Sequence, residues 1–161
     1  MQRIWALQRY GKLVLNRGRP GDAADILEAA FGLNGANGTS YTVLFDALRA
    51  AGRLDRAIAV SQAYADTMRA NGNATAEKWG RYNIGVVYRD SGRPGPALDA
   101  FMASYAAAAG QENAWQTACL LHQLGRDTEA GPYLEYVALH GDAKYASLAK
   151  NMQQRMKSPH P

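Results

Sequence analysis

The sequence predicts an all-α protein in which antiparallel helix pairs stack into a solenoid. Its composition favours helices, because 30 of the 161 residues are alanine, whereas valine and isoleucine together number 10 and threonine 6. Gly-Arg dipeptides with their glycine at positions 18, 52, 92 and 125 also follow one another at spacings of 34, 40 and 33 residues. An alanine follows each of these glycines five residues later, and self-similarity at such spacings is typical of helical repeats.

Each unit is interpreted as a helix, a glycine turn and a second helix. The glycine supplies the left-handed backbone conformation that ends the first helix, and the small alanine lets the second helix cross close to the first. The third unit is the clearest, with Tyr88 before Gly92, and Ala97 and Phe101 after it. Gly85 removes a side chain where these two helices would meet.

The four units give eight predicted helices. Apolar residues at helical spacing place them at residues 2–16 and 21–33, 39–51 and 54–71, 75–90 and 95–108, and 112–124 and 128–140. Asparagine and glycine mark the expected loops at 34–38, 71–73, 110 and 141. The 40 residues between the second and third turn glycines predict longer helices there than elsewhere.

A ninth helix is expected at residues 143–155. Asp142 can cap its start, and Tyr145, Leu148, Ala149 and Met152 fall on one face. Such a helix would cover the end of the stack. The expected organisation is therefore one domain, 1–141, of four helix-turn-helix repeats (2–34, 38–72, 75–109 and 111–141), a capping helix at 142–157 and a disordered tail at 158–161.

These units resemble the tetratricopeptide repeat (TPR) family over residues 2–140. The third unit matches well, and the first keeps Gly11 and Leu27 at family positions. The second departs from the pattern, with Phe45 where the family prefers glycine and Ser61 where it prefers a large apolar residue; the fourth is degenerate at its start. The resemblance implies a right-handed superhelix in which the first helix of each unit lines a concave groove.

The net charge of +4 comes from the two ends of the chain. Residues 1–19 hold five basic residues and no acidic one, and residues 142–161 hold four basic and one acidic. The stretch between them has nine basic and thirteen acidic residues, so a continuous phosphate-binding stripe is not evident. This distribution disfavours nucleic acid as a partner, and the contrast between ends and middle leaves self-association through the solenoid ends open.

The compartment is only weakly indicated. Cys119 is the single cysteine, which excludes an intramolecular disulfide and favours a cytoplasmic location, or a periplasmic one if a leader was removed. No apolar run approaches the ~18 to 20 residues of a membrane span. The helical pattern starts almost at Met1, as expected of a domain cut from a longer protein.

Catalytic and metal-binding patterns are lacking. The three histidines, His122, His140 and His160, fall in different segments, and no nucleophile–base–acid set is suggested. Cys119 and His122 would share a helix face, but no second ligand pair accompanies them. No glycine-rich loop follows a strand. We therefore expect no enzyme activity, no metal and no cofactor.

The resemblance carries groove positions over by their offset from each turn glycine. Twelve are expected to contact a peptide: Gln8, Lys12, Thr42, Asp46, Arg49, Trp79, Tyr82, Asn83, Arg89, Trp115, Gln116 and His122. Five further residues fall at groove positions: Trp5, Asn16, Val86, Glu112 and Cys119. Tryptophan and arginine suit recognition. For Trp5 and Trp79, the alternative to a groove role is packing against the preceding unit. For Trp115, packing and a groove role are expected equally.

Asn83 is the most specific of these residues. Asn83-Ile84-Gly85 resembles the Asn-Leu-Gly of long-helix family members, in which the asparagine amide binds the backbone of an extended peptide; a solvent-exposed asparagine is the alternative. Gln8 and Lys12 occupy positions at which chaperone-tail binders carry a lysine and asparagine set, which disfavours a chaperone C-terminus as ligand.

The arginines leave the charge of the ligand open. Arg49 and Arg89 would favour an anionic peptide unless Asp46 and Asp90 pair with them. The turn arginines would form a row along one edge, where solvation is the expectation rather than binding; they are Arg19, Arg53, Arg93 and Arg126.

These patterns favour a non-catalytic protein–protein interaction module that binds an extended peptide or partner helix in its groove. Two alternatives stay open. Residues 40–54 look like a unit of a pentatricopeptide RNA-binding protein, although the other units do not. The second alternative is that the chain is an accessory domain of a larger enzyme or secretion assembly.

Overall fold

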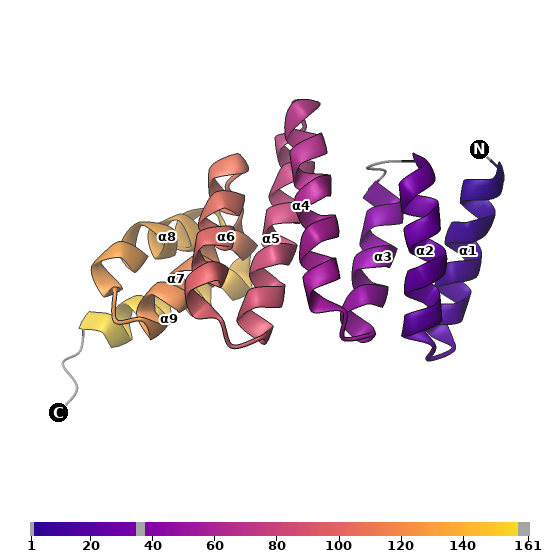
Figure 1. Cartoon of the computed structure of the whole chain (residues 1–161). Helices are drawn as coiled ribbons and strands as arrows, with labels where there is room; N and C mark the ends of the chain where they lie inside the picture. The colour runs from indigo at the N-terminus through magenta and orange to yellow at the C-terminus, as the bar shows by residue number, and fades with distance from the viewer. Residues whose placement is uncertain (1, 35–37, 158–161) are drawn as a thin grey trace.

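The computed structural model describes residues 2–34 and 38–157, which form nine α-helices and no strand (Figure 1). The helices follow one another in chain order, with α1 and α9 at opposite ends of the stack (Figure 1). They are α1 Gln2–Asn16, α2 Pro20–Asn34, α3 Gly38–Ala50, α4 Leu54–Ala70, α5 Ala74–Asp90, α6 Pro94–Ala107, α7 Gln111–Gln123, α8 Asp127–His140 and α9 Ala143–Lys157.

The predicted all-α solenoid of paired helices is confirmed, and every helix begins and ends within two residues of its predicted bounds. Two helices begin at a proline, Pro20 or Pro94, one residue earlier than predicted, because the first position of a helix needs no backbone donor. The predicted tail at 158–161 and the centre of the loop at 34–38 lie outside the described residues. None of the described helices is long and apolar enough to cross a membrane.

The turn glycines end the first helix of each pair as predicted. Their φ angles are positive, between 69° and 74° at positions 18, 52, 92 and 125. In the third pair, the N–H of Arg93 donates to the carbonyl of Tyr88 at 2.9 Å, and the N–H of Gly92 to that of Arg89 at 3.0 Å. This closure satisfies the last carbonyls of α5, and the Gly-Arg dipeptides after α3 and α7 repeat it.

Helices within a pair pack closely because large and small residues face each other. The alanine five residues after each turn glycine is fully buried in all four pairs. A Cβ atom on Gly11 would lie 2.5 Å from Leu27, and one on Gly85 would lie 2.7 Å from the Phe101 ring. The same two positions of the second pair hold Phe45 and Ser61, both buried. The second unit thus reverses the order of large and small residue at the contact.

The core consists of two clusters that meet at α5. One includes buried residues of α1 to α4 together with Val87, and the other includes Val86 and buried residues of α6 to α9. Between them α4 and α5 approach closely, because a Cβ atom on Gly80 would lie 2.9 Å from the Cβ of Ala65 and 3.0 Å from the carbonyl oxygen of Ser61. Small residues and backbone therefore join the two clusters.

The last helix packs against the fourth pair. Asp142 caps it, since its carboxylate accepts a hydrogen bond from the N–H of Tyr145 at 3.0 Å, as the sequence predicted. Ala149 is fully buried, and Tyr145, Met152 and Met156 pack on the second cluster. The outer face of α9 is mostly polar or charged.

Candidate functional site

The odd-numbered helices α1, α3, α5 and α7 form one face of the solenoid, called here the odd-helix face. Besides its contacts with neighbours in sequence, α1 contacts α3 and α7 contacts α9. Polar side chains join the rest: Gln8 of α1 donates to Ser40 of α3, and further hydrogen bonds link α3 to α5 and α5 to α7. All the predicted groove residues lie on these four helices.

Asn83 lies at the centre of this face in a hydrogen-bonded chain. Its Nδ2 donates to the hydroxyl of Tyr41 at 2.7 Å, and that hydroxyl donates to Oγ of Ser61 at 2.9 Å. Tyr41 and Ser61 are buried, and Tyr41 stacks on Tyr64 with 4.0 Å between ring centroids. Burial raises the pKa of Tyr41 to about 12, so its hydroxyl stays protonated. The Asn83 amide is held half-buried, with one of its two N–H groups bonded to Tyr41.

The arginines expected to attract an anionic peptide already form ion pairs with an acidic residue of the protein itself. Arg49 donates to one carboxylate oxygen of Asp90 at 2.9 Å, and Arg89 donates to the other at 2.8 Å. Arg89 also donates to Oε1 of Gln116 at 2.9 Å, which carries the network from α3 to α7. Asp46 makes no ion pair with a described residue, and desolvation raises its pKa despite the nearby charge of Arg49. Asp90 thus neutralises the centre of the odd-helix face.

The three tryptophans have different surroundings. Trp5 is 61% exposed and has the Arg9 guanidinium 4.9 Å above its ring. Trp79 is 39% exposed and meets Tyr82 edge-on at 5.5 Å between centroids. Neither is buried against a preceding unit. Trp115 is half-buried and packs edge-on against Tyr145 of α9 at 6.4 Å, so α9 covers part of the odd-helix face at this end.

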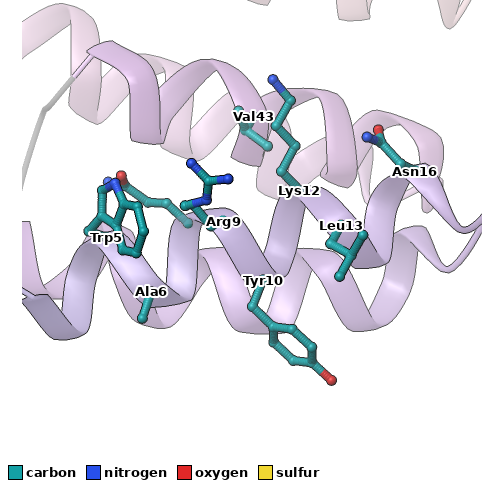
Figure 2. Close-up of a pocket in the computed structure, with 9 residues that line it drawn as sticks. Trp5, Ala6, Arg9, Tyr10, Lys12, Leu13, Asn16 and Val43 are labelled. Carbon is teal, nitrogen blue, oxygen red and sulfur yellow. The ribbon is translucent and has the colours of Figure 1, made fainter.

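Two hollows open along the face. The larger, about 820 Å³, extends around α1. Figure 2 shows Trp5, Lys12 and Asn16 on the side of α1 that faces Val43 of α3, whereas Ala6 and Tyr10, which also line the hollow, project from the other side. The smaller, about 540 Å³, is lined by Asp46, Arg49, Val87 and Asp90, among others. Thr42 is exposed on α3 between these hollows.

The remaining predicted residues offer less to a ligand. Val86 is buried in the second cluster and presents no surface. His122 is exposed at the end of α7, with its Nδ1 2.7 Å from Asp127. Glu112 and Cys119 are half-buried, and desolvation raises the pKa of the Cys119 thiol to about 11, which leaves it unreactive near neutral pH. Among residues 2–34 and 38–157, no three His, Cys, Asp or Glu side chains gather to hold a metal ion.

The turn arginines lie at the surface, and each contacts an acidic or aromatic side chain of the protein itself. Arg19, Arg53 and Arg126 pair with Asp22, Asp25 and Glu129, and Arg93 lies 4.7 Å above the ring of Tyr88.

Sequence reasoning missed two residues that contact predicted side chains of this face. It did not include Tyr41, which positions Asn83, or Tyr145, whose ring reaches Trp115 from another helix. Tyr41 stands eleven residues before its turn glycine, an offset that predicts a core position. Nothing in the sequence therefore indicated that its hydroxyl would bind a residue of the face. The predicted ninth-helix face did place Tyr145 on the side that packs.

Comparison with known proteins shows the fold. No protein-family model matches the chain, and no curated protein does. The crystal structure of MamA matches with a TM-score of 0.64 at 20% identity, covering 94% of this chain and 81% of that one. A second MamA crystal structure gives 0.63 at 19% identity, covering 98% and 79%. A Podosopora anserina protein of the kinesin light chain type, with nearly identical TPR-like repeats, gives 0.63 at 15% identity, covering 85% and 74%.

Proposed function

We propose that this TPR-like solenoid is a non-catalytic protein-interaction scaffold that holds an extended peptide or partner helix along the odd-helix face. The amide of Asn83 carries the proposal. Because its Nδ2 donates to Tyr41 at 2.7 Å, the orientation of the amide is fixed. No described residue donates to its Oδ1, which is therefore an acceptor for a peptide N–H.

The charges on the face indicate a peptide that is not strongly acidic at its centre. Asp90 already bridges Arg49 and Arg89, so a ligand carboxylate there would have to displace it. The exposed ring of Trp79 lies on the same helix as Asn83 and offers apolar contact area. We expect the ligand to contribute backbone hydrogen bonds near Asn83 and an apolar side chain toward Trp79.

A random peptide library displayed on phage, selected against the whole chain, provides a defined ligand for the test. Asn83→Ala is expected to weaken a selected peptide about 5- to 10-fold, the loss of about one hydrogen bond, and Trp79→Ala by tenfold or more. Asn151→Ala, on the exposed surface of α9, is the matched control and should leave the affinity unchanged.

The same peptides decide against the proposal in two cases. One is that selection against the folded chain enriches no peptide sequence beyond those that selection against the unfolded chain enriches. The other is that every enriched peptide binds Asn83→Ala, Arg89→Ala and Trp115→Ala as tightly as the parent chain.

A further inference from the structure

The outer side of α1 exposes large apolar side chains that no other helix within residues 2–34 and 38–157 covers. Tyr10 is 56% exposed and Leu13 46%. Figure 2 shows Ala6 and Tyr10 projecting from the side of α1 away from Val43, with Leu13 further along the helix. We call Ala6, Tyr10 and Leu13 the outer stripe of α1; it is distinct from the residues of α1 that face α3.

The repeat allows the outer stripe to be compared with the equivalent positions of the other units. Its three members stand twelve, eight and five residues before the turn glycine, Gly18. The residues with the same offsets in the other three units are all buried: Ser40, Leu44 and Ala47; Gly80, Ile84 and Val87; Asn113, Thr117 and Leu120.

In those units, the equivalent positions face the second helix of the preceding unit. Gly80 lies against Ala65 of α4, and the side chain of Asn113 donates to Ser104 of α6 at 3.1 Å. The helix pairs α2 with α3, α4 with α5, and α6 with α7 are in contact. Three interfaces of this chain therefore bury a helix on the surface that α1 leaves exposed.

The charge around the outer stripe indicates the chemistry of a helix that could cover it. Arg3, Arg9 and Arg17 form no ion pair with any described residue, and α1 holds no acidic residue. By contrast, seven of the nine basic residues between positions 20 and 141 are paired with Asp or Glu. The uncompensated positive charge of α1 complements an acidic surface.

We propose that the outer stripe of α1 docks an amphipathic α-helix of a partner protein, one whose apolar face is flanked by acidic residues. This helix occupies the place of a second helix in a preceding unit. The inference is independent of the peptide site proposed above, which uses other residues. The opposite end of a second copy does not fit, because α9 carries Lys144, Lys150, Arg155 and Lys157 and would repel α1.

The probe is a fluorescein-labelled peptide with the sequence of residues 20–33, stapled to hold it helical because so short a helix is marginal alone. It contains Asp22, Asp25 and Glu28 and no basic residue, and in the intact chain this segment packs against α3. Fluorescence anisotropy measures its binding to the whole chain. We expect saturable binding that weakens as salt is raised, together with slower hydrogen exchange in α1.

Three variants separate the outer stripe from other surfaces. Tyr10→Ser with Leu13→Ser is expected to weaken binding at least tenfold, and Arg3→Gln with Arg17→Gln several-fold with a flatter salt dependence. Leu139→Ser, which changes a side chain 70% exposed on α8, should have no effect. Circular dichroism checks folding, and Leu13→Ser alone is the milder variant should the double one unfold.

Several results would overturn the proposal. One is no saturable binding, and another is equal binding to the Tyr10 and Leu13 variant. A third is that the probe with its acids changed to Asn and Gln binds as well as the acidic one. Phosphatidylglycerol vesicles that bind through Tyr10 and Leu13 when the helix does not would assign the stripe to a membrane. Sedimentation showing a dimer that the double variant abolishes would assign it to a second copy.

Discussion

Replacing Gly85 by alanine tests how closely the helices of the third pair approach. A Cβ atom there would lie 2.7 Å from Cδ1 and Cε1 of Phe101 and 2.9 Å from its Cγ. The ring is fully buried and has Tyr82 on another side, with 5.2 Å between centroids, so it has little room to move. The added methyl group must therefore push α5 and α6 apart.

Two opposing terms set the size of the effect. Overpacking a core by a methyl group costs about 1 to 3 kcal/mol, whereas alanine in place of glycine inside a helix gains about 1 kcal/mol. We expect the free energy of unfolding to fall by up to about 2 kcal/mol, and Tm by up to about 6 °C for a chain of this length. Urea unfolding followed by circular dichroism at 222 nm measures it.

Gly32→Ala is the matched control, because a Cβ atom at residue 32 of α2 would meet no atom within 4 Å. It should raise the free energy of unfolding by up to about 1 kcal/mol. Phe101→Leu in the Gly85→Ala background should recover part of the loss, a coupling that a double-mutant cycle isolates. If Gly85→Ala stabilises the protein as Gly32→Ala does, the reasoning about this contact is wrong.

Three further predictions concern single positions. Tyr41→Phe removes the hydroxyl shared with α4 and α5 and should cost about 1 to 2 kcal/mol in urea unfolding, whereas Tyr10→Phe, at an exposed ring, should change stability by less than about 0.5 kcal/mol. Desolvation raises the pKa of Cys119 from 9.0 to about 11, so at pH 8 its thiolate should be about 100-fold scarcer in the folded protein than in the unfolded one. Its reaction with Ellman's reagent should therefore be slower in buffer than in urea by a similar factor, and about tenfold faster with each added pH unit. Equal rates in buffer and urea would contradict this. Gly92→Ala, at a φ of 69°, should cost about 1 to 2 kcal/mol, and a neutral result would show that the turn can relax.

The helices could be predicted from sequence because their signals are local. The turn glycine and the alanine five residues later depend on contacts within one unit, and they appear in all four units. Even where the second unit departs from the pattern, Phe45 and Ser61 keep the sum of sizes that the contact needs. Reading the two positions as a pair, rather than one at a time, removes that apparent exception.

The odd-helix face could be predicted in position but not in detail. Offsets from the turn glycine place Asn83, Arg89 and Gln116 on one surface, as the hydrogen bond between Arg89 and Gln116 illustrates. Whether Arg49 meets Asp90 or Asp46 depends on the register of α3 against α5, over 41 residues of sequence. Such register follows from packing between units, which no local pattern records.

The close approach at Gly80 bears on how the protein comes apart. Stability in a solenoid is roughly a sum of unit terms and nearest-neighbour terms, so the junction between the two clusters determines whether they melt together. Here that junction includes the contact of Gly80 with Ala65 and with the carbonyl oxygen of Ser61, and any side chain added at residue 80 would push α4 and α5 apart. We therefore expect a side chain at residue 80 to weaken the coupling between the two clusters, so that they unfold less cooperatively.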